Sequence, residues 1–347
     1  MKKTFCLALT LAFIFGVVGL AQAEAMKING AGASFPYPVY SQWAHKYKNL
    51  TGVEVNYQSI GSGGGIAQIK AKTVNFGGTD EPLKLEAQRE SDLLMFPMLI
   101  GGIVPVVNLK GVNAGELKLS QALLAEIFMG KIKSWDDPAL KKANPQLKLP
   151  PQAITIVHRA DGSGSTWLFT HYLSQISPEW KTAVGYGKVV SWPTGIGAKG
   201  NEGVSANVKR IDGSIGYVEY AYAIKGNLTY AKLQNQAGNF VAPSIESFQS
   251  AAAYADWENA PGYYLVLTNQ PGDQTWPIAG ATFILIHKNQ PNAKLAQAML
   301  AYFNWCFKHG SDIAEKLHYV PMPEEVVKMV EASWAQEIKA DGQAVGR

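Results

Sequence analysis

The sequence predicts an α/β protein built from two lobes. Short apolar runs alternate along the chain with amphipathic stretches, a pattern typical of strands and helices packed in layers. Several predicted strands are followed at once by a turn rich in Gly, Ser or Asp and then by a helix. The chain has 347 residues, and single hydrophobic cores stop growing at about 250–300 residues, so we expect two domains.

The first 23 residues predict a secretory signal peptide. Lys2 and Lys3 give a positive start, residues 7–20 form an apolar run, and the segment 21–23 (Ala-Gln-Ala) is a cleavage site of the small-x-small type. The apolar run is shorter than the roughly 20 residues of a membrane helix, so a cleaved signal is favoured over an anchor. We therefore expect a protein that is free beyond the inner membrane, in the periplasm.

The first elements after the signal are a helix, a strand and a second helix. Apolar residues recur at helical spacing between residues 39 and 50, and Gly52 readily takes the left-handed conformation at which helices stop. Residues 53–57 alternate with a period of two, which predicts a strand. A glycine turn at 61–65 and a helix follow. The apolar face of the first helix comprises Val39, Trp43, Tyr47 and Leu50.

The middle and the end of the chain repeat this order of elements. Residues 93–109 form a long apolar run broken by prolines and glycines, which we interpret as buried strand with a crossing point rather than as one element. A second cycle has a strand at 154–157, a polar turn at 159–165 and then a helix. A late buried strand at 282–287 precedes two further helices, around 293–307 and 324–338.

A late strand that rejoins the first layer predicts two lobes connected by more than one crossover. We expect lobe I to comprise residues 24–104 plus 277–347, and lobe II to comprise residues 105–276. Each lobe then contains strand–turn–helix segments of the same kind.

Charge and cysteine content exclude several classes of function. After removal of the signal, 29 basic residues stand against 27 acidic ones, too balanced for a nucleic-acid or anionic-membrane partner. Cys6 leaves with the signal and lies too early to be a lipoprotein cysteine. Cys306 is then alone, which excludes an internal disulfide or a thiolate metal cluster. The six histidines show no metal-ligand spacing, so we expect no metal and no cofactor.

Four polar turns share a design that suits an anion. Each presents backbone N–H groups at the start of a helix, where unpaired donors and the helix dipole favour negative charge. Ser and Asp are also the usual helix caps, so one such turn alone is weak evidence. Because the turns fall in both lobes at strand ends, where open α/β sheets bind ligands, they favour a small-anion site. The turns are Gly30–Phe35, Gly61–Gly64, Gly77–Asp80 and Arg159–Ser165.

Patterns that would indicate other functions are weaker. The loop 195–200 has the spacing of a dinucleotide fingerprint, but no clean strand leads into it, and we interpret it as a glycine loop before a helix. His158 lies beside Arg159, yet a core or solvated histidine is the simpler reading. A hydrolase using Ser163 or Ser165 as nucleophile lacks the nucleophile elbow and an evident general base.

The four turns resemble the signature turns of the periplasmic phosphate-binding proteins, the substrate-binding components of phosphate ABC transporters. Three further segments match the same family in order along nearly the whole mature chain: 130–137, 214–222 and 282–288. The resemblance implies the fold of type II periplasmic binding proteins, with a ligand cleft between the lobes that closes like a hinge. It also implies a monomer that delivers inorganic phosphate to permease subunits at the inner membrane, without catalysis.

The resemblance assigns phosphate ligands position by position. Ser34 and Phe35 would donate backbone N–H groups, and Ser62 both its N–H and its hydroxyl. Asp80 would accept a proton from the phosphate, and Arg159 would pair with the anion. Ser34 and Ser165 stand where threonine is usual in the family, which preserves the hydroxyl donor. The implied ligand-binding set is Ala33, Ser34, Phe35, Ser62, Asp80, Arg159, Asp161, Ser163, Gly164 and Ser165.

Asp80 gives this set a reason to prefer phosphate over sulfate. An ionised carboxylate only accepts hydrogen bonds, so a P–OH group satisfies it, whereas the unprotonated sulfate would place two acceptors face to face. A buried charge left unpaired in this way costs about 2–5 kcal/mol. A binding protein for sulfate, molybdate or arsenate, and a secreted phosphatase, are the alternatives that we carry forward.

Overall fold

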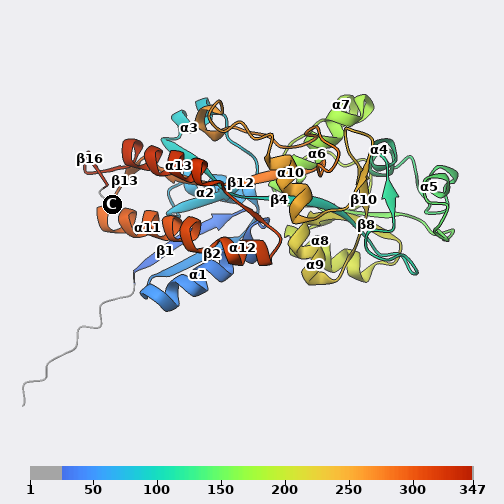
Figure 1. Ribbon diagram of the computed structural model, residues 1–347, viewed down its shortest axis with the longest axis horizontal. Coiled ribbons are helices and arrows are strands. Elements are labelled where there is room, and N and C mark those ends of the chain that lie inside the picture. The colour runs from blue at the N-terminus through green and yellow to red at the C-terminus, as the bar shows by residue number, and fades with distance from the viewer. Residues whose placement is uncertain (1–25, 346–347) are drawn as a thin grey trace, which may run out of the picture.

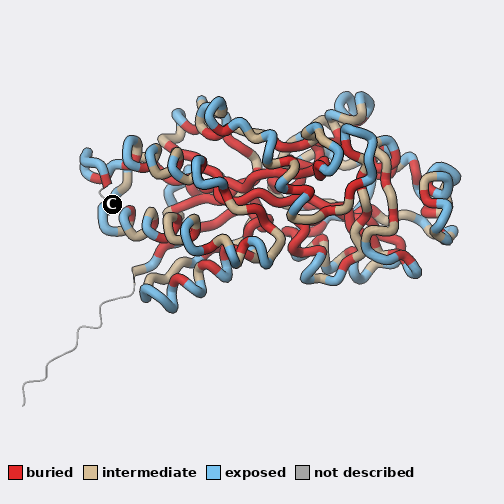
Figure 2. The backbone as a smooth tube through the Cα atoms, viewed as in Figure 1, coloured by how far each residue is buried: buried red, intermediate tan, exposed pale blue. Residues whose placement is uncertain are grey.

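The computed structural model describes residues 26–345, and one curved sheet runs through the length of the molecule (Figure 1). Buried segments form a central band along the long axis, and the exposed segments lie mostly on the outer helices (Figure 2). The first and last parts of the chain lie together at one end, and the middle part lies at the other (Figure 1). The predicted signal peptide, residues 1–23, lies outside the described residues.

The main sheet has the strand order β2-β1-β3-β12-β4-β8-β6-β7, and β9 and β14 also pair with β4. Two small sheets have the orders β11-β10-β5 and β13-β15-β16. The main-sheet strands are β1 (Lys27–Gly32), β2 (Glu54–Ser59), β3 (Phe76–Thr79), β4 (Leu93–Val107), β6 (Thr155–Arg159), β7 (Ile196–Ala198), β8 (Ser214–Glu219), β9 (Thr229–Tyr230), β12 (Ala279–His287) and β14 (Val320–Pro321). The others are β5 (Lys118–Leu119), β10 (Lys232–Gln234), β11 (Phe240–Val241), β13 (Asn289–Gln290), β15 (Lys339–Ala340) and β16 (Gln343–Ala344).

Helices pack against the sheet, and four of them start directly after the polar turns or close to them. The helices are α1 (Tyr37–Thr51), α2 (Ser62–Lys70), α3 (Leu85–Glu90), α4 (Gln121–Phe128), α5 (Pro138–Ala143), α6 (Gly164–Ile176), α7 (Pro178–Ala183), α8 (Gly200–Arg210), α9 (Tyr220–Gly226), α10 (Ile245–Ala252), the short 3-10 helix η1 (Pro261–Tyr263), α11 (Ala293–His309), α12 (Ser311–Lys316) and α13 (Glu324–Glu337).

The predicted first helix is α1, and one of its four apolar positions was assigned wrongly. Val39, Trp43 and Tyr47 are buried, and Gly52 ends the helix at φ +77° with its N–H donated to the Lys48 carbonyl. Leu50 is 63% exposed, because it lies in the last turn, beyond the part of the helix that the sheet covers. Helical spacing alone does not reveal where the contact with the sheet ends.

Strand β4 is a single element, contrary to the expectation that the run 93–109 would be broken. Its first part pairs antiparallel with β12 and its last part pairs antiparallel with β8. The register shifts between Thr282 and Phe283, opposite Pro97. Because proline has no N–H to donate, an irregularity at this point lets the strand continue through it. The expected crossing point is therefore a change of neighbour along one continuous strand.

The late strand rejoins the first layer as predicted. β12 lies between β3 and β4 and is antiparallel to both. We call β2-β1-β3-β12 the first sheet half and β8-β6-β7 the second sheet half; β4 joins them. The division into lobes at residues 104 and 277 stays a proposal, and β4 spans the first of these positions.

The second cycle and the last helices were also predicted, with small differences at their ends. Strand β6 begins one residue later and ends two residues later than expected. On α6, Trp167, Leu168, Tyr172 and Leu173 are all buried.

No helix within residues 26–345 combines the length and apolar character needed to cross a membrane. Cys306 is a buried free cysteine on α11.

Gly32 marks the closest approach of two neighbouring strands, and we expect Gly32→Ala to destabilise the protein. It has φ +150°, and an added Cβ would lie 2.1 Å from the Gly78 carbonyl oxygen on β3. Since backbone atoms cannot swing aside, the loss should be about 3 kcal/mol or more of unfolding free energy. Gly52→Ala is the control, because its Cβ would meet nothing within 4 Å and only left-handed strain of about 1–2 kcal/mol remains.

Urea denaturation followed by circular dichroism measures both variants. Equal losses in Gly32→Ala and Gly52→Ala would contradict this account of the contact between β1 and β3.

Candidate functional site

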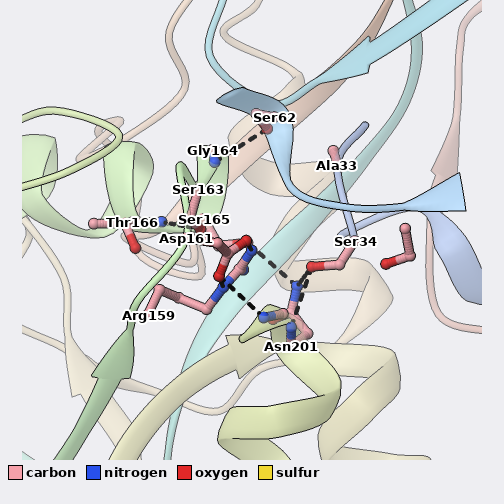
Figure 3. Close-up of polar contacts among 12 residues, drawn as sticks. Ala33, Ser34, Ser62, Arg159, Asp161, Ser163, Gly164, Ser165, Thr166 and Asn201 are labelled. Atoms are coloured by element: carbon pink, nitrogen blue, oxygen red, sulfur yellow. Dashed lines mark hydrogen bonds and ion pairs between the residues drawn. The ribbon is translucent and has the colours of Figure 1, made fainter. Parts of the chain in front are cut away.

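The four predicted segments meet where the two sheet halves face each other, and Figure 3 shows residues of three of them. The fourth joins through Asp80, whose N–H donates to Ser62 Oγ at 3.2 Å. Gly30–Phe35 lies at the end of β1, Gly61–Gly64 leads from β2 into the first turn of α2, and Arg159–Ser165 leads from β6 into α6. Gly77–Asp80 was wrongly predicted as a turn before a helix, because Gly77–Thr79 belong to the hydrogen-bonded strand β3 and α3 begins only at Leu85. This segment brings Asp80, the residue directly after the strand, to the same place.

The backbones of two turns touch: Gly63 N–H donates to the Gly162 carbonyl at 2.8 Å. Across the same gap, Gly164 N–H donates to Ser62 Oγ at 3.1 Å. The structure thus brings predicted site residues from both halves together.

Glycine at position 164 is required by this approach. Gly164 is the first residue of α6, and an added Cβ would lie 2.5 Å from Ser62 Oγ and 2.6 Å from Asp80 Cβ. Real Cβ atoms do not approach other atoms so closely. The N-terminus of α6 therefore rests directly against the side chains that follow β2 and β3.

Asp80 is buried, and both of its carboxylate oxygens accept hydrogen bonds, Oδ2 from Ser62 Oγ at 3.5 Å. It is 1% exposed, and its Oδ1 accepts from Thr282 Oγ1 at 2.8 Å. Burial raises the pKa of Asp80 to about 7, although the Thr282 hydrogen bond and the Arg159 charge act in the opposite direction. A group with this pKa can gain or lose a proton near neutral pH at little cost. Asp80 is therefore an acceptor that can test a ligand for a proton where it is ionised, which the pKa places above about pH 7.

Arg159 and Asp161 form a buried two-pronged ion pair. Arg159 Nε donates to Asp161 Oδ1 at 2.7 Å, and Nη2 donates to Oδ2 at 2.5 Å. Burial would raise the pKa of Asp161, but the hydrogen bonds and charge of Arg159 outweigh it and hold that pKa below its ordinary value. Within residues 26–345, the buried Arg159 Nη1 has no hydrogen-bond partner. One edge of the guanidinium thus remains available to an acceptor.

The turn after β1 offers backbone donors next to this group. Among residues 26–345, the N–H groups of Ser34 and Phe35 donate to no protein acceptor, and both side chains are buried. Ala33 differs, since its N–H donates to the Gly78 carbonyl and its own carbonyl accepts from Tyr57. The backbone donors of this turn are therefore those of Ser34 and Phe35.

The serines at the start of α6 have distinct surroundings. Ser163 caps the helix, its Oγ accepting from Thr166 N–H at 3.0 Å, and its own N–H donates to the Lys188 carbonyl at 3.0 Å. Ser165 is wholly buried. Within the described part of the chain, neither hydroxyl is hydrogen-bonded to a histidine or a carboxylate. The arrangement offers hydroxyl donors without the adjacent base that a serine nucleophile needs.

Asn201 lies at the candidate site, and sequence reasoning did not identify it. It is wholly buried as the second residue of α8, and its Nδ2 donates to Ser34 Oγ at 2.8 Å. The preceding Gly200 donates its N–H to Asp161 Oδ1 at 3.0 Å. The loop 195–200 is indeed followed by a helix, as predicted, but it also contains β7 and reaches the site. A polar residue directly after a glycine loop at a helix start was the available signal.

Two further side-chain contacts cross the gap at its rim. The Lys188 ammonium pairs with the Glu81 carboxylate, and Ser59 Oγ donates to Glu202 Oε1 at 3.2 Å. Glu81 follows Asp80 directly, and the Lys188 carbonyl accepts from Ser163 N–H. The pair of Lys188 and Glu81 is therefore linked directly to two candidate site residues, to Asp80 along the chain and to Ser163 through a hydrogen bond.

His158, which the sequence places beside Arg159, has a packing role in the structure. His158 is half-buried and stacks on Trp192, and burial lowers its pKa. No group of three or more His, Cys, Asp or Glu side chains in the range 26–345 has the arrangement of a metal site.

Comparison with known proteins identifies the family. A family model described as a PBP superfamily domain matches residues 20–307. "Phosphate-binding protein PstS" of Pasteurella multocida is 54% identical over 339 residues, covering 97% of this chain and 98% of that protein. The protein of the same name from Haemophilus influenzae is 53% identical, covering 98% and 100%. These relatives are named as binding proteins rather than as enzymes.

Solved structures agree on the fold. A high-affinity periplasmic phosphate-binding protein (PfluDING) bound with phosphate superposes with a TM-score of 0.72 at 20% identity, covering 93% of this chain and 99% of that one. A putative phosphate ABC transporter substrate-binding protein from Clostridium perfringens superposes with a TM-score of 0.62 at 17% identity, covering 86% and 100%. The chain belongs to the PBP superfamily and, within it, to the family of the PstS phosphate-binding proteins.

Proposed function

We propose that this protein binds inorganic phosphate between its two sheet halves, in the periplasm, and delivers it to the permease subunits of an ABC importer. The observation that carries the proposal is the contact of Gly164, from the second half, with Ser62 and with the buried Asp80 carboxylate of the first half. Relatives at 53–54% identity are named as phosphate-binding proteins. Export is supported by the signal pattern of residues 1–23, and a monomer and the absence of catalysis remain parts of the proposal.

The proposed phosphate cage combines neutral donors with one cation. Ser34 and Phe35 would donate backbone N–H groups to the phosphate. The side of the Arg159 guanidinium that carries Nη1, which has no partner among the described residues, would donate to one or two phosphate oxygens. Hydroxyls of Ser163 and Ser165 would supply donors at the start of α6, where the helix dipole favours an anion. Hydroxyls of Ser34 and Ser62 would supply donors from the first half. Asp161 would hold the guanidinium in place, Gly164 would permit the approach, and Ala33 would contribute only by positioning its neighbours.

Binding and closure are one event in this proposal. Ligand groups lie on both halves, so phosphate stabilises the form in which the halves meet, because only there are all donors used. The ion pair of Lys188 and Glu81 adds a contact that forms in the closed arrangement. Since both side chains are partly exposed, that pair contributes at most about 1 kcal/mol.

Isothermal titration calorimetry on the ligand-stripped protein tests the function directly. We expect a micromolar or lower dissociation constant for phosphate, about 8 kcal/mol or more, and much weaker binding of sulfate and molybdate. Arsenate, which can also carry a proton, is the control expected to compete. No heat with phosphate would refute the proposal, and turnover of a chromogenic phosphate ester would revive the phosphatase reading.

At pH 8, where Asp80 is ionised, Asp80→Asn should reduce discrimination between phosphate and sulfate by on the order of 100-fold. The amide can donate to an unprotonated oxygen, so sulfate no longer faces an unpaired carboxylate. Titration of the variant and the parent protein with both anions measures the ratio of dissociation constants. An unchanged ratio would contradict the role given to Asp80.

The raised pKa of Asp80 also predicts how ligand-free stability depends on pH. Between the unfolded pKa of about 3.9 and the folded value of about 7, the folded chain holds a proton that the unfolded chain releases. Stability from this group is therefore fully present below pH 4 and falls as pH rises toward 7. From pH 5 to pH 8, the parent protein should lose about 2–3 kcal/mol more unfolding free energy than Asp80→Asn. Urea titrations in phosphate-free buffer measure this, and equal losses would argue against a buried, protonated Asp80.

Gly164→Ala should uncouple folding from binding. The added methyl would collide with Ser62 and Asp80 only when the halves meet, so phosphate affinity should fall by about 100-fold or more. Without phosphate the variant can relieve the collision by separating the halves, so its unfolding free energy should fall by less than its binding free energy, and alanine itself favours a helix. The matched control is Gly203→Ala inside α8, where the nearest atom to an added Cβ lies at 3.5 Å. Full affinity in Gly164→Ala would show that the two halves do not come this close when phosphate binds.

A further inference from the structure

We infer that Asn201 makes the Ser34 hydroxyl an obligatory donor toward the ligand, and does so only when the two sheet halves have closed. This inference rests on the proposed function, because it concerns how the same site recognises phosphate. It assigns to Asn201 a positioning role, acting through Ser34.

The orientation of the Asn201 amide is fixed by the backbone. Its Oδ1 accepts from Glu219 N–H at 2.9 Å. A backbone N–H can only donate, so the oxygen of the amide must face Glu219 and the NH₂ group must face the other way. The NH₂ group then lies 2.8 Å from Ser34 Oγ and 3.4 Å from Ser165 Oγ (Figure 3).

Ser34 Oγ consequently has both of its lone pairs occupied. Asn201 donates to it twice, from Nδ2 at 2.8 Å and from its own backbone N–H at 3.1 Å. A serine hydroxyl has two acceptor sites and one proton. With both acceptor sites filled, the remaining capacity of Ser34 is to donate that proton, and within residues 26–345 it donates to no protein acceptor.

Because Ser34 and Asn201 are buried, the donor direction of the Ser34 hydroxyl affects which ligand oxygen can bind there. Ser34 is 1% exposed and Asn201 is wholly buried, so water does not readily replace a missing partner. A ligand oxygen that accepts at Ser34 satisfies the proton, whereas a ligand hydroxyl placed there would leave two donors facing each other. Ser34 therefore selects an unprotonated oxygen, complementary to Asp80, which accepts from a protonated one.

The polarity depends on closure because the two residues lie on opposite halves. Ser34 follows β1, whereas Asn201 starts α8, which packs on β6 and β8. Separating the halves would remove both donors and leave the hydroxyl free to turn. The Tyr222 hydroxyl reinforces the contact by donating to the Ser34 carbonyl at 2.7 Å.

A double-mutant cycle with inorganic phosphate tests this inference. Calorimetry on the ligand-stripped full chain compares the parent protein with Ser34→Ala, Asn201→Ala and the double variant. We expect each single change to weaken binding by about 10- to 100-fold, and the double variant to bind within about 3-fold of Ser34→Ala, because Asn201 acts through that hydroxyl. Multiplied losses would overturn the inference.

Two further variants separate this role from a structural one. Asn144 is equally buried and also bridges backbone groups, to Lys118 and Leu140, far from the site; Asn144→Ala should lower stability yet leave phosphate affinity unchanged. If Asn201→Ala does not fold, Asn201→Leu keeps the side-chain shape and removes the Nδ2 donor without adding a charge that would itself repel phosphate. Its loss of affinity should shrink at least 10-fold when Ser34→Ala is already present, and an equal loss in both backgrounds would refute the inference. Failure of the parent protein to bind phosphate would instead refute the proposed function.

Discussion

The contact between the turn after β2 and the turn after β6 is the constraint on which the site depends. Gly63 N–H meets the Gly162 carbonyl at 2.8 Å, so the two backbones touch without any side chain between them. A Cβ at Gly61 would lie 2.3 Å from Asp161 Oδ2. Glycine is needed here because larger residues would hold the halves apart and leave the hydroxyl and carboxylate groups of each turn out of reach of the other.

The charges at the site are few, and each is already paired or buried. Arg159 gives one edge to Asp161, and Asp80 has lost much of its tendency to ionise. In the proposed phosphate site, the attraction for the anion would therefore come mainly from oriented N–H and O–H dipoles, which cost little to reorganise because the fold holds them in place. In this proposal the Asp80 carboxyl and the Ser34 hydroxyl held by Asn201, rather than net charge, would decide which ligand oxygens carry protons.

Most of the fold and part of the site could be predicted from the sequence. The order of strands and helices followed from periodicity, and the four turns followed from their composition. The continuity of β4 could not be predicted, because Pro97 is a strand breaker unless the facing strand shifts its register, and pairing between distant segments is invisible in local sequence. Leu50 was misplaced because periodicity identifies a helix face but not how far the sheet covers it. Asn201 was missed because its role depends on Ser34, 167 residues away.

Strand β4 also determines how the molecule can be divided. Its fifteen residues are all buried, and it hydrogen-bonds to β12 at one end and to β8 at the other. If the chain were cut within β4, both fragments would expose an unpaired strand edge, and β12 would lose hydrogen bonds to β4. Expressing either half as an isolated fragment would therefore favour aggregation over folding. A biosensor made by inserting a reporter domain should use the exposed loop near Gly238 rather than the junction between the halves.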